Sequence, residues 1–166
     1  YALPLPGGTA VARVTDGGNC FNMNSLVQEL APGVYQGYAP TRQQFARLMR
    51  LLQVPSQVAE QIAAGASDWI DSDSDPLVQG AEDPSYTGLA PGYRTAGTLM
   101  ADPSELRAVA GVTPAIYATL QPWVCTLPRA EPAKININTL APEQAPLLAM
   151  LLPDTVSVGA VQQQLL

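Results

Sequence analysis

Residues 41–69, TRQQFARLMRLLQVPSQVAEQIAAGASDW, predict two consecutive α-helices at the centre of the chain. Thr41 and Gln44 have the spacing of a capping box, and apolar side chains recur three and four residues apart behind them. Pro55 ends the first helix, because proline has no N–H to continue the hydrogen-bond ladder. A second helix is expected to start at about Ser56, since its apolar residues also recur on one face. The centre of the chain is therefore helical.

The segment before these helices predicts a β-hairpin. Residues 9–15, TAVARVT, alternate in the manner of a strand, and residues 16–19, DGGN, supply turn glycines. Residues 21–26, FNMNSL, are expected to be the second strand, and residues 31–40 a loop that leads into the first helix. Two strands alone are not stable, so this hairpin needs a partner in a larger sheet.

The segment after the helices predicts a loop followed by a tight helical hairpin. Residues 84–100 have no clear period and read as an ordered loop with Tyr86 and Tyr93 as anchors. Asp102 and Thr113 each precede a proline, which is typical of a capping residue followed by the first helical position. Two short helices are therefore expected at residues 103–111 and 114–121.

The last quarter of the chain contains an echo of an earlier motif. Residues 135–140, ININTL, share with FNMNSL the pattern apolar-Asn-x-Asn-Ser/Thr-Leu. Asparagine side chains readily bond nearby backbone, so both motifs are expected to fix turns at strand ends. A helix is expected through residues 147–151, and a further helix opened by Asp154 or Thr155.

Composition limits the class of protein. The chain has 166 residues, of which 47% are apolar, enough for an ordinary core, and its 16 prolines favour short elements. It has no histidine, which removes the Ser-His-Asp constellation and the commonest transition-metal ligand. Cys20 and Cys125 are too few for a zinc site and are either two buried thiols or one disulfide. The longest apolar runs fall short of the roughly 20 residues that cross a bilayer.

Residues 68–83, DWIDSDSDPLVQGAED, concentrate the acidic charge of the chain. The stretch has six carboxylates and no basic residue, which equals the formal net charge of −6 of the whole sequence. So many like charges in one short segment repel one another unless a cation neutralises them. The acidic residues are Asp68, Asp71, Asp73, Asp75, Glu82 and Asp83.

The spacing of these carboxylates matches a calcium loop, but the backbone does not match an EF-hand. With Asp71 at position 1, Asp73 and Asp75 fall at positions 3 and 5 and Glu82 at position 12. Position 6 of an EF-hand is a glycine, whereas here it is Pro76, whose fixed φ cannot make that turn. We therefore expect a hard-cation site with its own loop geometry. Calcium is favoured over magnesium because the oxygen ligands are many and all protein-borne.

Two alternative functions were weighed against a cation site. A carboxylate pair could serve as the acid and base of a glycosidase, but the sequence shows no sugar-stacking aromatic platform beside the loop. Residues 106–117 and 135–151 resemble helix-hairpin-helix modules, which bind DNA phosphates through a turn with two glycines. Here Gly111 is present but Thr113 takes the second place, and few basic residues surround it.

Features in this order resemble one family, the K-type minor pseudopilin of the type II secretion system, also called general secretion pathway protein K. The resemblance spans nearly the whole chain. It is carried by LPLPGG (3–8), FNMNSL (21–26), DWIDSD (68–73) with Pro76, GAED (80–83) with Tyr86, PGY (91–93), ELRAVAG (105–111), Tyr117 with Leu120, PWV (122–124), LP (127–128) and ININT (135–139).

The resemblance implies an α+β fold, in which a pilin-like antiparallel sheet carries a large, mainly helical inserted domain with helix-hairpin-helix-like elements. Residues 1–37 would then belong to the pilin-like β-subdomain and residues 38–166 to the inserted domain. Members of the family have an N-terminal hydrophobic helix, which this sequence lacks, and continue well past the position of Leu166. The inserted domain is therefore expected to be incomplete at its C-terminal end.

The resemblance also implies a role and a location. It implies a non-enzymatic subunit at the tip of the pseudopilus, which helps to initiate or cap the filament for protein export across the outer membrane. The implied partners are the I- and J-type minor pseudopilins, and possibly the H-type, with no nucleic acid. The implied location is periplasmic, with the full-length protein anchored in the inner membrane before assembly through the N-terminal helix alone.

Finally, the resemblance implies a ligand and a covalent link. It implies calcium at the acidic loop, which falls on Asp71, Asp73 and Glu82, with Asp75 and Asp83 as further candidates. The oxidising periplasm favours a disulfide between Cys20 and Cys125, which would tie the sheet to the inserted domain.

Overall fold

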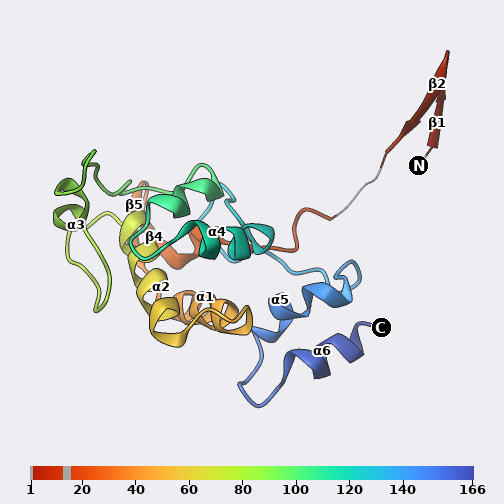
Figure 1. Ribbon diagram of the computed structural model, residues 1–166. Coiled ribbons are helices and arrows are strands. Elements are labelled where there is room, and N and C mark those ends of the chain that lie inside the picture. The colour runs from red at the N-terminus through yellow and green to blue at the C-terminus, as the bar shows by residue number, and fades with distance from the viewer. Residues whose placement is uncertain (1, 13–15) are drawn as a thin grey trace.

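The computed structural model describes residues 2–12 and 16–166 and combines short helices with short strands, so the expected mixture of helix and strand is confirmed (Figure 1). The strands are β1 (Ala2–Leu5), β2 (Gly8–Val11), β3 (Phe21–Asn22), β4 (Val27–Ala31), β5 (Val34–Gly37) and β6 (Val124–Cys125). The α-helices are α1 (Ala39–Leu51), α2 (Ser56–Ile70), α3 (Asp83–Thr87), α4 (Pro114–Leu120), α5 (Ala145–Ala149) and α6 (Val158–Gln164). The 3-10 helices are η1 (Met23–Leu26), η2 (Pro103–Ala108), η3 (Gln121–Trp123) and η4 (Pro142–Gln144).

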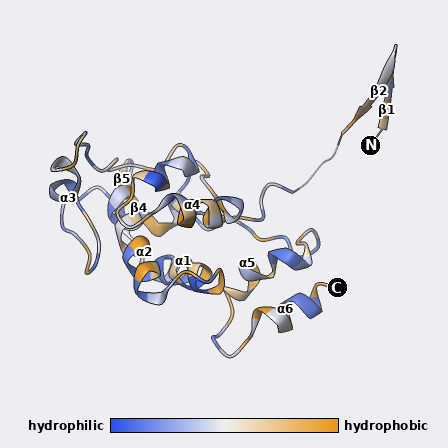
Figure 2. Ribbon diagram, in the orientation of Figure 1, coloured by the Kyte–Doolittle hydropathy of each residue, from blue (hydrophilic) through white to orange (hydrophobic). Residues whose placement is uncertain are grey.

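Helices α1 and α2 pack against each other and supply much of the core, as their periodicity predicts. Hydrophobic and hydrophilic residues alternate along α1 in Figure 2, in keeping with one buried and one exposed face. The predicted capping box is wrong, because α1 begins at Ala39 and Thr41 lies inside its first turn. The hydroxyl of Thr41 instead donates to the carbonyl oxygens of Ser25 and Tyr38, which ties α1 to the segment before it.

The predicted hairpin between residues 9–15 and 21–26 is wrong, although residues 13–15 lie outside the described residues. β2 pairs antiparallel with β1, because a tight turn with Gly7 at a φ of 89° closes that pair over a short distance. Phe21 and Asn22 pair in parallel with Val124 and Cys125. The β1–β2 hairpin stands away from the helical body in Figure 1, whereas residues 21–26 are buried inside it.

A second hairpin lies where a loop was expected at residues 31–40. β4 and β5 pair antiparallel, and Gly33 at a φ of 73° allows the turn between them. The hairpin ends at Gly37, just before α1. The expected loop is therefore corrected to a strand over Val34–Gly37.

The asparagines of FNMNSL fix the backbone, as predicted, but they act over long distances in the sequence. Asn22 accepts hydrogen bonds from the backbone N–H groups of Asn24 and Leu127. Asn24 donates to the carbonyls of Met100 and Leu127 and accepts from the N–H of Met100. These buried amides therefore hold three distant segments together.

A single hydrophobic cluster joins residues before and after the predicted domain boundary at residues 37 and 38. Phe21 stacks on Phe45 of α1 at 4.9 Å between ring centroids, and Met23 and Leu26 are fully buried in the same cluster. The boundary itself stays a prediction. The segment from residue 21 onward packs with the helices rather than apart from them.

The loop of residues 84–100 is anchored by its tyrosines, as predicted. Tyr86 is buried, and its hydroxyl accepts a hydrogen bond from the N–H of Ala110. The hydroxyl of Tyr93 donates to the carbonyl of Ala108, and both rings lie against Trp69 at the end of α2. This aromatic group holds the loop beside the C-terminal end of α2.

The caps predicted for the helical hairpin are confirmed, whereas the cap of the last helix is different. Asp102 forms a capping box with Glu105 at the start of η2, and the Thr113 hydroxyl caps α4. The last helix α6 is capped by Ser157 and not by Asp154 or Thr155. Asp154 instead forms an ion pair with Arg47 of α1 at 2.8 Å.

Candidate metal centre

The acidic residues are arranged around the C-terminal end of α2, where the loop that is yellow-green in Figure 1 leads to α3. The last turns of α2 are buried, and Asp71 follows the helix as its C-cap, with its N–H bonded to the carbonyl of Ser67. The C-terminal end of a helix carries a partial negative charge, so it disfavours carboxylates. An acidic cluster at this position therefore favours a nearby cation.

Three of the predicted ligands come together. Each of Asp71, Asp73 and Glu82 offers one carboxylate oxygen, and these three oxygens all lie within 4.8 Å of one another. Asp73 is exposed, whereas Asp71 and Glu82 are 4% and 3% exposed. The cluster therefore has a buried floor and an open side.

The buried oxygens of this cluster lack partners. Oδ1 of Asp71 and Oε1 of Glu82 have no hydrogen-bond partner among the residues that the structure describes. A buried carboxylate oxygen without a donor is costly, because it has lost its hydration and gained nothing in return. A hard cation that accepts oxygen ligands would satisfy both atoms, so the residues present fit such an ion.

Electrostatics leads to the same conclusion. Burial raises the pKa of Asp71 to about 7, and the charges of Asp73, Asp68 and Glu82 add to this effect. Burial likewise raises the pKa of Glu82 to about 7, with Asp68 as the next cause and the hydrogen bond from Thr95 opposing it. Without a cation the ionised cluster is therefore disfavoured, and a divalent ion would reverse the sign of the local field.

Asp68 lies one turn before the end of α2 and is fully buried. Its Oδ2 accepts hydrogen bonds from the N–H groups of Leu77 and Ala81, at 3.1 and 2.9 Å. Burial raises the pKa of Asp68 to about 6, although these two hydrogen bonds and the charge of Arg42 lower it. Asp68 is thus bound to the loop and is not a member of the three-oxygen group.

The structure does not bring Asp75 and Asp83 into the three-oxygen group. Asp75 is exposed, and its N–H donates to Oδ1 of Asp73 at 2.9 Å. Asp83 opens α3 and is engaged elsewhere, by an ion pair with Arg94 at 3.4 Å and by hydrogen bonds from Thr95. Their roles as ligands remain predictions.

Residues that no acidic pattern indicates also border the centre. The hydroxyl of Thr95 lies 3.4 Å from Oε2 of Glu82, and no sequence signal marks it. A Cβ at Gly37 of β5 would meet Ser67 Oγ at 2.9 Å and Asp71 Oδ2 at 3.6 Å, so the hairpin packs closely behind the centre. Ser72 exchanges hydrogen bonds with the backbone of Tyr35, which fixes the start of the loop to β5.

The disulfide between Cys20 and Cys125 is present. It lies beside the β3–β6 pair and closes a sequence separation of 105 residues. It joins the start of the buried N-terminal segment to the strand that follows η3. The alternative of two free thiols is therefore excluded.

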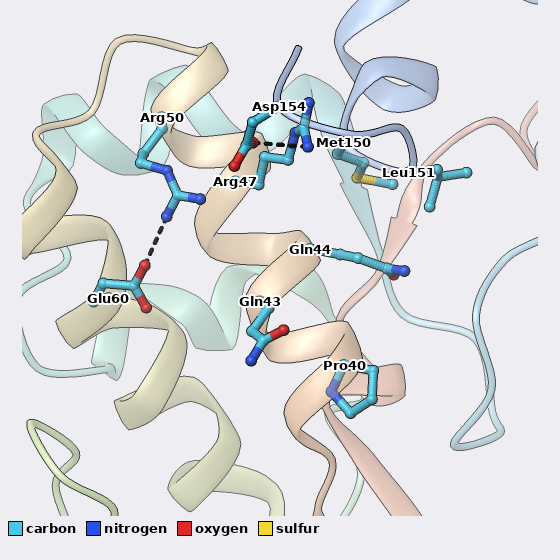
Figure 3. Close-up of a pocket in the computed structure, with 9 residues that line it drawn as sticks. All are labelled: Pro40, Gln43, Gln44, Arg47, Arg50, Glu60, Met150, Leu151 and Asp154. Carbon is cyan, nitrogen blue, oxygen red and sulfur yellow. Dashed lines mark hydrogen bonds and ion pairs between the residues drawn. The ribbon is translucent and has the colours of Figure 1, made fainter. Parts of the chain in front are cut away.

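A separate groove of about 420 Å³ lies between α1 and the segment after α5 (Figure 3). Its charged groups are already engaged, because Arg47 pairs with Asp154 and Arg50 pairs with Glu60 at 2.6 Å, as the dashed lines show. The remaining polar groups of the lining are the amides of Gln43 and Gln44. The groove therefore offers no activated nucleophile and no general base.

Within the described part of the chain, none of the helices is both long and apolar enough to pass through a bilayer.

Comparison with known proteins identifies the family. The family model described as "Type II secretion system (T2SS), protein K" matches residues 19–129. "Type II secretion system protein K" of Klebsiella pneumoniae is 39% identical over 95% of this chain and 48% of its own length. The protein of that name from Aeromonas hydrophila is 40% identical over 98% of this chain and 50% of its own length. The chain thus spans about half the length of these relatives.

A solved structure is similar as well. One chain of the crystal structure titled "GspK-GspI-GspJ complex from enterotoxigenic Escherichia coli Type 2 Secretion System" matches with a TM-score of 0.76 and 34% sequence identity. The match covers 91% of this chain and 52% of the other. Together these likenesses show that the chain belongs to the type II secretion system protein K family.

Proposed function

We propose that this chain is part of a non-enzymatic minor pseudopilin that assembles with the I- and J-type pseudopilins at the tip of the type II secretion pseudopilus. The observation that carries the proposal is the TM-score of 0.76 over 91% of the chain against the GspK-GspI-GspJ complex. The relatives are about twice as long as the chain, so the proposal concerns the longer protein to which these residues correspond.

The mechanism in this proposal is geometric. A bulky helical head on a filament subunit blocks the face to which a further subunit would add, and head-to-tail assembly needs a free face at both ends to continue. The subunit would therefore start or cap the filament that exports proteins across the outer membrane. The groups of the described residues are used for packing and ion pairing, which agrees with a structural role.

The pilin-like sheet is the second part of the proposal. The β1–β2 hairpin is exposed along nearly its whole length, and Leu3, Leu5 and Val11 are 52%, 55% and 82% exposed. An isolated two-stranded hairpin is marginal in water. We infer that further strands of the longer protein extend it to an antiparallel sheet, and that the helical elements are inserted into that sheet.

A periplasmic location, with an inner-membrane anchor before assembly, is proposed from the family and from the disulfide. Disulfides persist in oxidising compartments, including the bacterial periplasm, and are rare in the cytosol. The bond between Cys20 and Cys125 supports this location.

The acidic loop is proposed to bind calcium as a structural ion. Asp71, Asp73 and Glu82 would hold it, and Asp75 and Asp83 remain further candidates. The support is the pair of buried, unpartnered oxygens and the all-oxygen donor set. The ion would neutralise the loop and hold it folded rather than take part in a reaction.

Co-purification tests the assembly. The chain, extended to the length of its relatives, is co-expressed with the periplasmic domains of the I- and J-type pseudopilins of the same system. A complex of one copy each is expected in size-exclusion chromatography with light scattering. Failure of all three to co-elute would contradict the proposal. A low-salt gel shift with duplex DNA tests the helix-hairpin-helix alternative, and we expect no shift.

Thermal unfolding tests the calcium proposal. The melting temperature of the chelated chain is expected to rise on addition of calcium and to rise less with magnesium, which keeps more of its own water. Identical melting curves in EGTA and in calcium would rule the proposal out.

A further inference from the structure

Asp68 has a place in the acidic loop that the three-oxygen group does not explain. It is fully buried on the last full turn of α2, and the three-oxygen group excludes it. One of its oxygens, Oδ2, accepts the N–H of Leu77, nine residues later, and the N–H of Ala81, thirteen residues later. A single carboxylate oxygen therefore holds both sides of the turn at the tip of the loop.

The turn itself is built to fit this carboxylate. The N–H of Gly80 donates to the carbonyl of Leu77 at 2.8 Å, and Gln79 between them has a φ of 69°. A Cβ at Gly80 would lie 1.9 Å from Oδ2 of Asp68 and 2.8 Å from its Cγ. Because such contacts are impossible, only glycine lets the turn approach the carboxylate so closely.

We propose that Asp68 is a positioning residue, a latch that closes the loop so that Glu82 returns to Asp71 and Asp73. Glu82 directly follows Ala81, whose N–H the latch holds, while Asp71 and Asp73 follow α2 on the other side of the loop. The hydrogen bonds of the latch are charge-assisted and buried, which makes them strong. The cation affinity thus depends on a carboxylate that does not touch the cation.

The latch rests on the proposed calcium function only for its effect on affinity. Its hydrogen bonds to Leu77 and Ala81 are present in the structure without any ion. Amide hydrogen exchange therefore tests the latch, and calorimetry with calcium chloride tests its consequence for the ion. The two readouts separate a failure of the latch from a failure of calcium binding.

The Gly80→Ala variant breaks the latch but keeps every carboxylate of the loop. We expect calcium affinity to fall about 10- to 100-fold, the usual effect of losing an outer partner of a metal site. The amides of Leu77 and Ala81 should exchange faster in the chelated variant. Gly88→Ala is the matched control, because Gly88 is exposed and a Cβ there meets nothing within 4 Å. Wild-type affinity and protection in Gly80→Ala would overturn the proposal.

Two substitutions of Asp68 distinguish a latch from a ligand. Asp68→Asn keeps a carbonyl oxygen that can accept from Leu77 and Ala81, whereas Asp68→Ala removes the acceptor. We expect Asn to restore most of the amide protection and most of the calcium affinity that Ala loses. If Asn protects the amides but loses as much affinity as Ala, Asp68 binds the ion directly and the proposal is overturned.

The remaining outcomes are equally decisive. If the wild-type chain binds no calcium, but the Leu77 and Ala81 amides are protected and lose protection in Asp68→Ala, the latch stands and the calcium function fails. If these amides exchange equally fast in wild type and Asp68→Ala, the latch fails whether or not calcium binds. Circular dichroism of each variant confirms that the helical body is folded in every comparison.

Discussion

Asp71 and Glu82 approach each other from opposite ends of the acidic loop, and each buries a carboxylate oxygen that has no hydrogen-bond partner among the described residues. The floor of the candidate metal centre is therefore made of two groups whose charges oppose folding in the absence of a cation. This relationship gives the loop opposite energetic signs in its ion-free and ion-bound states.

Removing one of these charges should stabilise the ion-free protein and abolish its response to calcium. For Glu82→Gln we expect a gain of about 1–3 kcal/mol in the free energy of unfolding at pH 8 without calcium, because each unit of pKa shift corresponds to about 1.4 kcal/mol. The measurement is urea unfolding with and without calcium. The exposed Glu143→Gln serves as control, with a change below about 0.5 kcal/mol. A variant that is destabilised without calcium, or still stabilised by it, would contradict the arrangement.

The stability of the calcium-free chain should fall as the pH rises from about 5 to about 8. The pKa values of Asp71 and Glu82 are raised to about 7 and that of Asp68 to about 6, above the ordinary values of 3.8 and 4.5. The folded state therefore binds more protons than the unfolded state in this window, so stability is present at low pH and is lost as these groups ionise.

Saturating calcium should reverse the direction of this pH dependence, because the ion binds the ionised carboxylates and competes with protons. Unfolding midpoints measured at pH 5, 6, 7 and 8 with and without calcium check both trends. A stability of the calcium-free chain that rises steadily with pH would show that the buried carboxylates of the loop are compensated in some other way.

Much of the helical framework and the centre of the site could be predicted from local pattern. The core-facing period of α1 and α2 and the caps at Asp102 and Thr113 depend on neighbours in the sequence, so the sequence shows them directly. The group of Asp71, Asp73 and Glu82 followed from the spacing of oxygens along one loop. That spacing also suggested Asp75 and Asp83, which the structure places outside the group.

Long-range contacts could not be predicted in this way. The parallel pair of Phe21 with Val124 involves two-residue strands, which are too short to carry an alternating pattern. Thr41 has the sequence of a cap, but its hydroxyl bonds the carbonyl of Ser25, a contact that depends on tertiary packing. Thr95 reaches Glu82 from a segment without a period, so no local signal could place it beside the metal centre.

Loss of the disulfide should destabilise the chain strongly. We expect the Cys20→Ser, Cys125→Ser double variant to lose about 2–5 kcal/mol, because the bond closes a separation of 105 residues and restricts the unfolded chain. Chemical unfolding of wild type with and without dithiothreitol, beside the double variant, measures the effect. Reduction should lower the stability of wild type and leave the double variant unchanged. Equal stability of the oxidised wild type and the variant would contradict this role.

Asn24 should be among the most sensitive polar positions. Its side chain is fully buried and bonds both backbone groups of Met100 and the carbonyl of Leu127. Asn24→Ala is expected to cost about 2–4 kcal/mol, since each orphaned buried polar group costs about 1–3 kcal/mol. Urea unfolding measures the loss, and the exposed Asn138→Ala is the matched control with little expected change. A near-neutral Asn24→Ala would show that the three segments are held together by other contacts.

Calcium titration of the chelated wild-type chain by calorimetry at about pH 7.5, in parallel with the Asp71→Asn, Glu82→Gln double variant, tests the acidic loop most directly. Saturable binding with a Kd below about 1 mM is expected for wild type, and none for the double variant. Absence of binding by the wild-type chain, or unchanged binding by the double variant, would contradict a calcium centre at Asp71, Asp73 and Glu82.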